Sequence, residues 1–72
     1  MDPYAALKNL DGALHATPCD REAIYDATEA LIGWCRSGGF LPFNAESHDW
    51  RQHLTRTEFV TYLWHLNIVA KD

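Results

Sequence analysis

Two cysteines and four histidines are the side chains of this chain that could support nucleophilic chemistry. A cysteine thiolate activated by a neighbouring histidine is a common protein nucleophile. Cys19 follows Pro18 at the start of a predicted helix, where the helix dipole can lower a thiol pKa. Only His15 stands near it in the sequence. Cys35 lies beside the predicted apolar stripe of the same helix, where buried thiols are usually inert. The pattern favours a protein without catalytic activity.

The same side chains, together with His48 and His53, are all permitted zinc ligands. A structural zinc site needs four convergent ligands, which usually come as two close pairs. His15 and Cys19 are separated by a predicted helix break, and Cys35 has no second cysteine near it. We therefore expect neither a metal nor a cofactor. A small metal- or thiol-dependent protein is the third functional alternative.

Three basic side chains gather just before a predicted helix N-terminus, where free backbone amides can hold an anion. They are Arg51, His53 and Arg56. No glycine-rich phosphate loop accompanies them. The alternative is a solvated turn in which these charges balance Asp49 and Glu58, and the sequence favours this interpretation.

Acidic residues outnumber basic ones, ten to six, and the formal net charge is −4. Glu22, Asp26 and Glu29 recur at spacings of four and three, on the side of a predicted helix opposite its apolar residues. This face is either solvated or docks a basic partner, since complementary charge speeds association. Direct nucleic-acid binding is not expected, because it needs a basic face. The second functional alternative is a nucleic-acid mimic, whose acidic face occupies a basic channel of a nucleic-acid-binding protein.

The segment Leu54 to Ile68 carries the signals for the start, body and end of one helix. Thr55 followed by Glu58 three residues later forms a capping box. Asn67 suits the left-handed position that ends a helix. The segment is also rich in β-forming residues, but these end signals favour a helix over residues 55–67 with a frayed tail after it.

The apolar face of this helix is wider than a single core contact requires. Phe59, Leu63 and Leu66 form its centre, and Val60 and Trp64 extend it on one side. At ~100° per residue the apolar arc spans roughly 200°, whereas a core-facing stripe needs only ~100°. The flank with Val60 and Trp64 is therefore either covered by another part of the chain or exposed to bind a partner.

Two arrangements explain this width. In the first, aromatic residues of the preceding loop cover the flank and close a three-helix core, because a small domain needs all the core available. These loop residues are Phe40, Phe43 and Trp50. In the second, the flank is exposed as a protein interface, where Trp and Tyr are favoured anchors. The candidate partner-binding residues are Val60, Trp64, Tyr25, Ile32, Glu22, Asp26 and Glu29.

The elements that must position these side chains are helical. Asp2 before Pro3 opens a helix that we expect over residues 3–16, and a cap at Thr17 opens a second over residues 18–37. Gly38 or Gly39 supplies its left-handed end. The short connection between the two helices predicts an antiparallel hairpin.

Residues 38–54 are predicted to form an apolar loop before the third helix. Its last part, residues 47–54, either continues the loop or forms a short helix. Ser47 would cap that helix, and Trp50 and Leu54 would be buried under it. The fold class is thus a compact all-α, three-helix domain.

Seventy-two residues make one domain, residues 1–72. The chain shows no signal peptide and no run approaching the ~20 apolar residues of a membrane span. Two cysteines are too few for a disulfide framework. We therefore expect a cytoplasmic protein without membrane association. The leading function is a non-catalytic interaction module, an inhibitor or adaptor of the size that phages and mobile elements encode. It would bind a larger protein or a second copy of itself.

Overall fold

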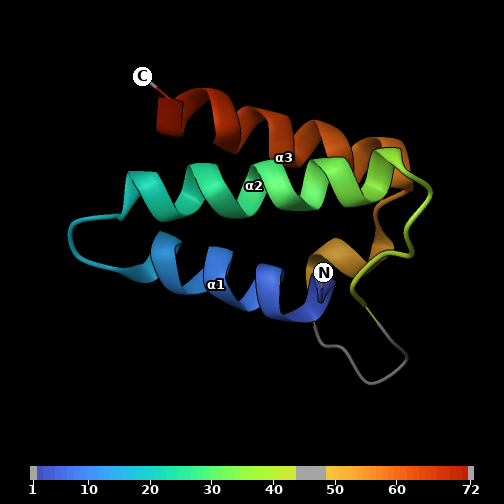
Figure 1. Ribbon diagram of the computed structural model, residues 1–72. Helices are drawn as coiled ribbons and strands as arrows, with labels where there is room; N and C mark the ends of the chain where they lie inside the picture. Colours follow the sequence, from blue (N-terminus) through green and yellow to red (C-terminus); the bar gives the residue numbers. More distant parts are fainter. Residues whose placement is uncertain (1, 44–48, 72) are drawn as a thin grey trace.

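The computed structural model describes residues 2–43 and 49–71 and confirms an all-α domain of three helices (Figure 1). The helices are α1 (Pro3–His15), α2 (Arg21–Arg36) and α3 (Arg56–Lys71), and a short 3-10 helix, η1 (Trp50–His53), precedes α3. Along the chain, each α-helix runs antiparallel to the one before it (Figure 1). None of the residues within these two ranges forms a strand.

The start of α1 confirms the predicted cap. The Asp2 carboxylate accepts a hydrogen bond from the backbone N–H of Tyr4 at 3.0 Å, and Pro3 occupies the first turn. Asp satisfies amides that have no partner within the helix, and Pro has no amide to satisfy. The helix ends at His15, one residue before the predicted limit.

The predicted start of α2 is wrong by three residues. Asp20, rather than Thr17, is the N-cap, and its carboxylate accepts from the Ala23 N–H at 3.1 Å. Asp is a better N-cap than Thr, and the Asp20 N–H also donates to the Ala13 carbonyl at 3.2 Å, which ties the connection to the end of α1. The first helix and the second are therefore joined by a longer segment than the sequence predicted.

The predicted left-handed end of α2 is at Gly38 and forms a Schellman motif, and the helix ends at Arg36, one residue before the predicted limit. Gly38 has a φ of 90°, and its N–H donates to the Cys35 carbonyl at 3.2 Å. The Gly39 N–H donates to the Trp34 carbonyl at 2.9 Å. These two bonds satisfy carbonyls that the last turn leaves free.

The start of α3 confirms the predicted capping box. The Thr55 N–H donates to Glu58 Oε1 at 2.9 Å, and the Glu58 N–H donates to Thr55 Oγ1 at 3.2 Å. The predicted end and the frayed tail are wrong, because α3 continues to Lys71. Asn67 does not end the helix; it is buried against α2, where its amide donates to Thr28 Oγ1 at 3.0 Å.

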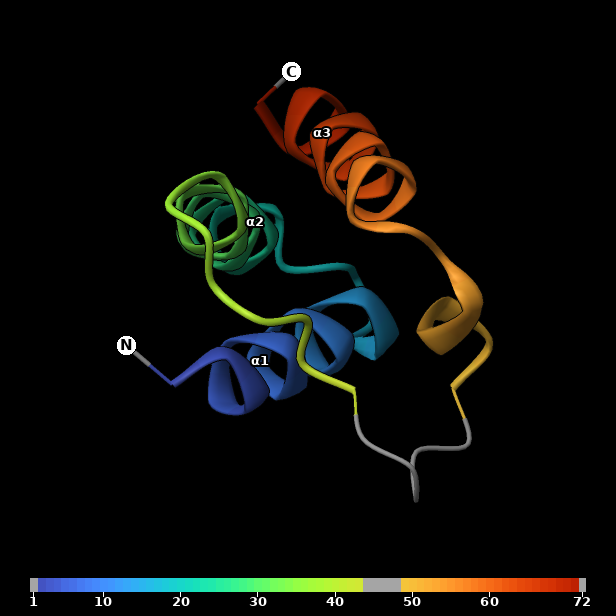
Figure 2. The ribbon, with the colours of Figure 1, turned by 90° about the vertical axis from the view of Figure 1, so that its right-hand side faces the viewer.

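The core lies along α2, which packs against both α1 and α3. Viewed along the helices, α1 and α3 approach α2 from different sides, and η1 lies near both α1 and α3 (Figure 2). One aromatic residue of the loop, Phe43, closes the core from the η1 side, where its ring forms a T-shaped contact with Phe59 with ring centroids 5.4 Å apart. The buried apolar residues are Leu7, Leu10, Ala13, Ile24, Ala27, Leu31, Ile32, Cys35, Phe59 and Leu63.

One buried arginine links α1, η1 and α3. The guanidinium of Arg51 donates two hydrogen bonds to the carboxylate of Asp11, each of 2.9 Å, and one to the Tyr62 hydroxyl at 3.2 Å. Its Nε also donates to Asp49, at 2.9 Å to Oδ1 and 3.0 Å to Oδ2. We call Arg51, Asp11, Asp49 and Tyr62 the Arg51 cluster. It joins side chains that lie 40 positions apart in the sequence.

Candidate functional site

The predicted flank of α3 is partly exposed. Val60 is half-buried against the core, Trp64 is 39% exposed and Ile68 is 54% exposed. These residues are four positions apart, which is slightly more than one helical turn of 3.6 residues. Each therefore lies about 40° further around the helix axis, away from the core, than the one before. They therefore form one strip that runs from the core edge into solvent.

Two of the three loop aromatic residues, Trp50 and Phe40, pack elsewhere than over the flank of α3. Trp50 packs edge-on against Tyr62, with ring centroids 5.7 Å apart, and Phe40 packs edge-on against Trp34 at 5.3 Å. Tyr62 lies about 160° around α3 from Trp64, so the contact with Trp50 is on the other flank of the helix. The expected burial of Trp50 is wrong, because its side chain is 64% exposed.

On α2 the structure corrects the predicted flank at Ile32, which is buried in the core. The helix contacts two neighbours, so its buried face is wider than a single stripe and includes this residue. Tyr25 is half-buried, and Glu29, on the next turn, is exposed. The neighbouring carboxylate of Glu29, followed by burial and then the charge of Asp26, raises the pKa of the Tyr25 hydroxyl.

Helix angles place part of the exposed surface of α2 and the flank of α3 on the side away from α1. The α1-facing side of α2 carries Ala23 and Ala27, and Tyr25 lies on the opposite flank at ~100° per residue. On α3, the side toward α1 and η1 carries Tyr62, and Trp64 lies on the opposite flank. We call this side the outer face of the α2–α3 pair, and its residues are Tyr25, Glu29, Val60, Trp64 and Ile68.

The acidic residues of α2 are placed as predicted. Glu22, Asp26 and Glu29 are all exposed. Glu29 is nearest to the outer face, whereas Asp26 lines a groove between α1 and α2. The three carboxylates therefore form a ridge along α2 that borders the outer face at one edge.

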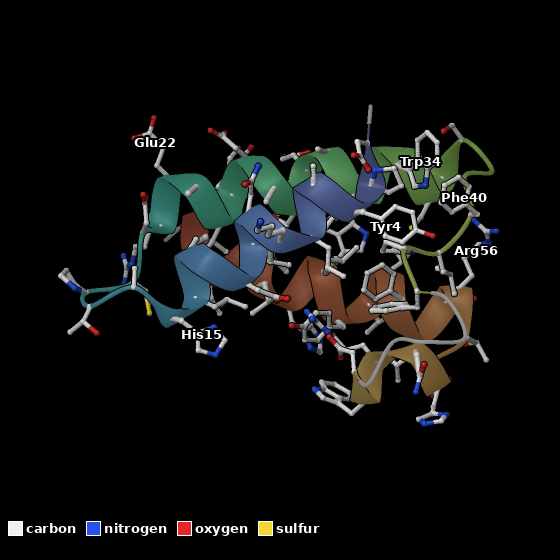
Figure 3. All side chains as sticks on the ribbon, turned by 90° about the horizontal axis from the view of Figure 1, so that it is seen from below. Tyr4, His15, Glu22, Trp34, Phe40 and Arg56 are labelled. Atoms are coloured by element: carbon white, nitrogen blue, oxygen red, sulfur yellow. The ribbon has the colours of Figure 1, made fainter. Side chains whose placement is uncertain are left out.

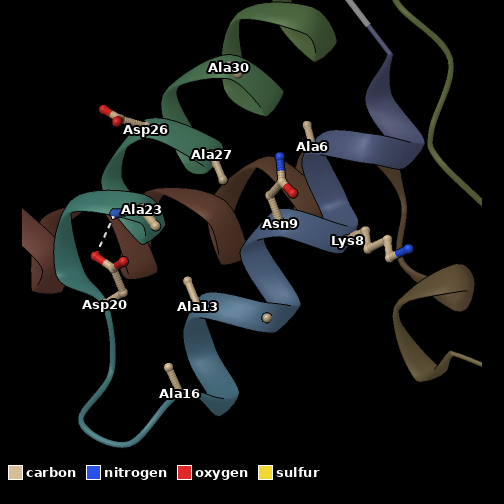
Figure 4. A pocket seen from close by; sticks show the side chains of 11 residues that line it. Ala6, Lys8, Asn9, Ala13, Ala16, Asp20, Ala23, Asp26, Ala27 and Ala30 are labelled. Atoms are coloured by element: carbon tan, nitrogen blue, oxygen red, sulfur yellow. Dashed lines mark hydrogen bonds between the residues drawn. The ribbon is translucent and has the colours of Figure 1, made fainter.

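The groove between α1 and α2 has a volume of about 650 Å³ and is lined mainly by small residues (Figure 4). Ala13, Ala27 and Gly12 are among them, and such side chains let two helices approach closely. The hydrogen bond drawn in Figure 4 is the Asp20 cap on the Ala23 amide. The groove thus follows from close helix packing, and its polar lining residues are Lys8, Asn9, Asp20 and Asp26.

An aromatic cluster that the sequence analysis missed lies at the start of α1. The Trp34 indole N–H donates to the Phe40 carbonyl at 2.7 Å, and the Phe40 ring lies 5.9 Å from that of Tyr4. Figure 3 shows these three side chains together with Arg56 at one end of the molecule. In the sequence, the glycine at position 39 is the feature that could have indicated this cluster, because a Cβ there would lie 2.3 Å from the Trp34 ring.

The predicted anion cluster is not assembled as such. Arg51 is buried and paired with two carboxylates. Arg56 donates to the Cys35 carbonyl at 3.1 Å and to the Gly39 carbonyl, at the end of α2. A cation at a helix C-terminus is favoured by the helix dipole. For Arg51, the structure supports the alternative interpretation, in which nearby carboxylates balance the positive charge.

The two thiols differ in their surroundings. The exposed Cys19 Sγ–H donates to the Leu14 carbonyl at 3.4 Å, and the neighbouring His15 Nδ1 pairs with the Asp11 carbonyl at 2.7 Å. Burial raises the pKa of the Cys35 thiol, and the charge of Arg56 opposes this shift only in part. Neither thiol is thus hydrogen-bonded to a general base in residues 2–43 and 49–71.

In residues 2–43 and 49–71, no three His, Cys, Asp or Glu side chains are grouped so that they could hold a metal ion. Two predicted residues, Ser47 as a cap and His48 as a ligand, lie outside these ranges. The cap of η1 that the structure describes is Asp49, whose carboxylate accepts from the Arg51 N–H at 2.9 Å.

None of the helices in the described part of the chain has the length and apolar character that crossing a bilayer requires. Comparisons of the chain with models of protein families, with curated proteins and with solved structures find no match.

Proposed function

We propose that this protein is a non-catalytic interaction module that binds a larger protein through the outer face of the α2–α3 pair. The observation that carries the proposal is the exposure of Trp64 and Ile68 on successive turns of α3. A domain of this size has little apolar surface to spare for solvent. Tryptophan is among the residues that contribute most to protein interfaces.

The edge of this face indicates the chemistry of the partner. Glu29 borders the face directly, and Glu22 and Asp26 continue the acidic ridge along α2. The net charge of the chain is −4. An apolar pocket surrounded by basic side chains would complement this surface, and the charges would speed association.

A crosslinking experiment tests the proposal. A photoreactive amino acid at Ile68 should form a covalent adduct with a protein in a lysate of the source organism. The same amino acid at Val69, which is also exposed but lies ~100° further around α3, should not. Adducts at both positions, or at neither, would contradict the outer face as the binding surface.

A substitution then measures the contribution of the anchor. Trp64→Ala should weaken binding of the crosslinked protein by about 2 kcal/mol or more, roughly 30-fold. Helical circular dichroism should stay unchanged, because part of this side chain is already in solvent. If Trp64→Ala unfolds the domain, the residue belongs to the core and the assignment fails.

The exposed carboxylates of α2 support one competing proposal, a nucleic-acid mimic. Binding through Glu22, Asp26 and Glu29 would weaken steeply with salt, because exposed charges are screened. Binding through Trp64 and Ile68 would change little. A salt titration of the same complex separates the two, and light scattering of the isolated protein tests for a homodimer.

A further inference from the structure

A second hollow, separate from the outer face, opens between α1, η1 and α3. Its volume is about 560 Å³ and its lining includes Asp11, Asp49, Trp50, Arg51 and Tyr62. It therefore contains the Arg51 cluster together with the indole of Trp50. Tyr62 and Trp64 lie about 160° apart around α3, so this hollow and the outer face are on different flanks of the helix.

The charge that this hollow presents to solvent is negative. One guanidinium, that of Arg51, faces two carboxylates, those of Asp11 and Asp49. The Arg51 side chain is only 6% exposed, whereas the Asp11 and Asp49 side chains are 38% and 27% exposed. The cation is thus covered and the excess carboxylate charge is accessible. The hydrogen bond from Arg51 also lowers the pKa of Asp49, and this carboxyl therefore stays ionised.

Among residues 2–43 and 49–71, Arg51 alone donates hydrogen bonds to the Asp11 side chain. Each of its carboxylate oxygens accepts one hydrogen bond from Arg51. A carboxylate oxygen has two lone pairs, so each can accept a second donor from the solvent side. A further cation could therefore bind Asp11 without displacing Arg51.

The exposed indole of Trp50 supplies the second element of a cation site. Its edge-on contact with Tyr62 holds the ring at the rim of the hollow. The face of an aromatic ring attracts cations, and the face of Trp does so most strongly. A planar guanidinium can stack flat on an indole while one of its N–H groups donates to a remaining lone pair of Asp11, whereas an ammonium group has no plane to stack.

We propose that this hollow binds the guanidinium of an arginine side chain from a partner protein, between the Trp50 ring and the partly exposed carboxylate of Asp11. On the buried side of the hollow, Arg51 already combines a carboxylate contact with an aromatic one. It donates to Asp11 through two nitrogens, and its guanidinium carbon lies 5.7 Å from the centre of the Tyr62 ring. The site does not depend on the outer face.

The test is a titration of the isotope-labelled full chain with a capped Gly-Arg-Gly peptide, followed by NMR. The chain has three tryptophans, so the three indole N–H signals report separately. The Trp50 signal should move, and those of Trp34 and Trp64 should not. A peptide with citrulline in place of arginine has the same shape without the charge. It should bind on the order of tenfold more weakly. A lysine peptide should fall between the two.

Two variants localise the binding. Trp50→Ala should weaken binding of the arginine peptide about 2- to 5-fold, and its fold should persist because the side chain is mostly exposed. Trp64→Ala, the control, should bind the peptide like the wild type. Equal binding of the citrulline peptide, a shift of the Trp64 signal alone, or unchanged affinity of Trp50→Ala would each overturn the proposal. Binding of the lysine peptide as tightly as the arginine peptide would overturn the choice of arginine. The outer-face proposal would stand in each case, because Trp64→Ala tests it separately.

Discussion

The substitution Arg51→Met should be among the most destabilising in this chain. It keeps much of the apolar stem and removes the guanidinium, together with its hydrogen bonds to Asp11, Asp49 and Tyr62. Two carboxylates are then left near each other without a cation. Removing one partner of a fully buried pair costs about 3–5 kcal/mol.

The magnitude here is smaller, because water reaches the carboxylates. The side chains of Asp11 and Asp49 are 38% and 27% exposed. Once this hydration is allowed for, we expect a loss of about 2–4 kcal/mol. A chain of 72 residues has a total stability of roughly 4–11 kcal/mol. The loss is therefore a large share of the free energy of unfolding.

Urea denaturation followed by helical circular dichroism measures this loss. Arg21→Met, at an exposed arginine of the first turn of α2, is the matched control and should change the free energy of unfolding by no more than about 0.5 kcal/mol. In a double variant with Asp11→Asn, the two losses should fall short of additivity by about 1–3 kcal/mol. A loss for Arg51→Met no greater than that for Arg21→Met would refute the reasoning.

The pH dependence follows from Asp49, whose pKa in the folded protein is lowered, first of all by its hydrogen bond with Arg51. A carboxyl with a lowered folded pKa contributes its stability above its ordinary pKa, which is 3.8 here, and loses it as the pH falls through the lowered value. The stability difference between wild type and Arg51→Met should therefore narrow on acidification below that ordinary value.

Three further predictions concern other parts of the fold. Gly39→Ala should cost about 1–3 kcal/mol in denaturant titrations, because the new Cβ would meet the Trp34 ring at 2.3 Å; an unchanged Trp34 indole signal in NMR spectra would contradict this contact. Thr55→Ala should destabilise the domain by about 1 kcal/mol through loss of the capping box, measured in the same titrations, and an unchanged midpoint would show that the cap contributes nothing. A thiol reagent should modify Cys19 in the native protein and Cys35 only after unfolding, because Cys35 is buried and burial raises its thiol pKa; equal native rates would show that the core opens readily.

Several helix ends that depend on nearby residues could be predicted from the sequence, although the start of α2 at Asp20, which is equally local, was not. The Asp2 cap, the Thr55–Glu58 capping box and the glycine end at Gly38 all involve hydrogen bonds between residues at most five positions apart. Such bonds form in much the same way whatever the rest of the fold does. The number of helices and their order followed from these signals and from the apolar periodicity.

Features that depend on distant residues could not be predicted in this way. Asn67 has the side chain of a helix end, but its partner is Thr28, 39 positions away. Arg51 has the side chain of a surface cation, but its guanidinium binds Asp11, 40 positions away. No local pattern distinguishes these residues from exposed ones.

The candidate site was predicted in part for the same reason. Periodicity placed Trp64 on the flank of α3. The sequence left open whether loop residues cover it, and in the structure it is 39% exposed. The burial of Ile32 and the exposure of Trp50 depend on how neighbouring segments pack, and the sequence predicted both wrongly. The hollow beside Trp50 therefore had no counterpart in the sequence analysis.

The buried hydrogen bond between Asn67 and Thr28 also fixes the alignment of α3 along α2. The Thr28 hydroxyl donates to its own helix, at 2.8 Å to the Ile24 carbonyl, so its oxygen is free to accept from Asn67. If α3 slid by one turn, about 5.4 Å, the amide and the hydroxyl oxygen would face apolar neighbours instead. Each unpaired group would cost about 1–3 kcal/mol. We therefore expect the main effect of this pair to be the destabilisation of arrangements in which α3 is shifted along α2. The contact between the two helices, which is otherwise apolar, then has a single register.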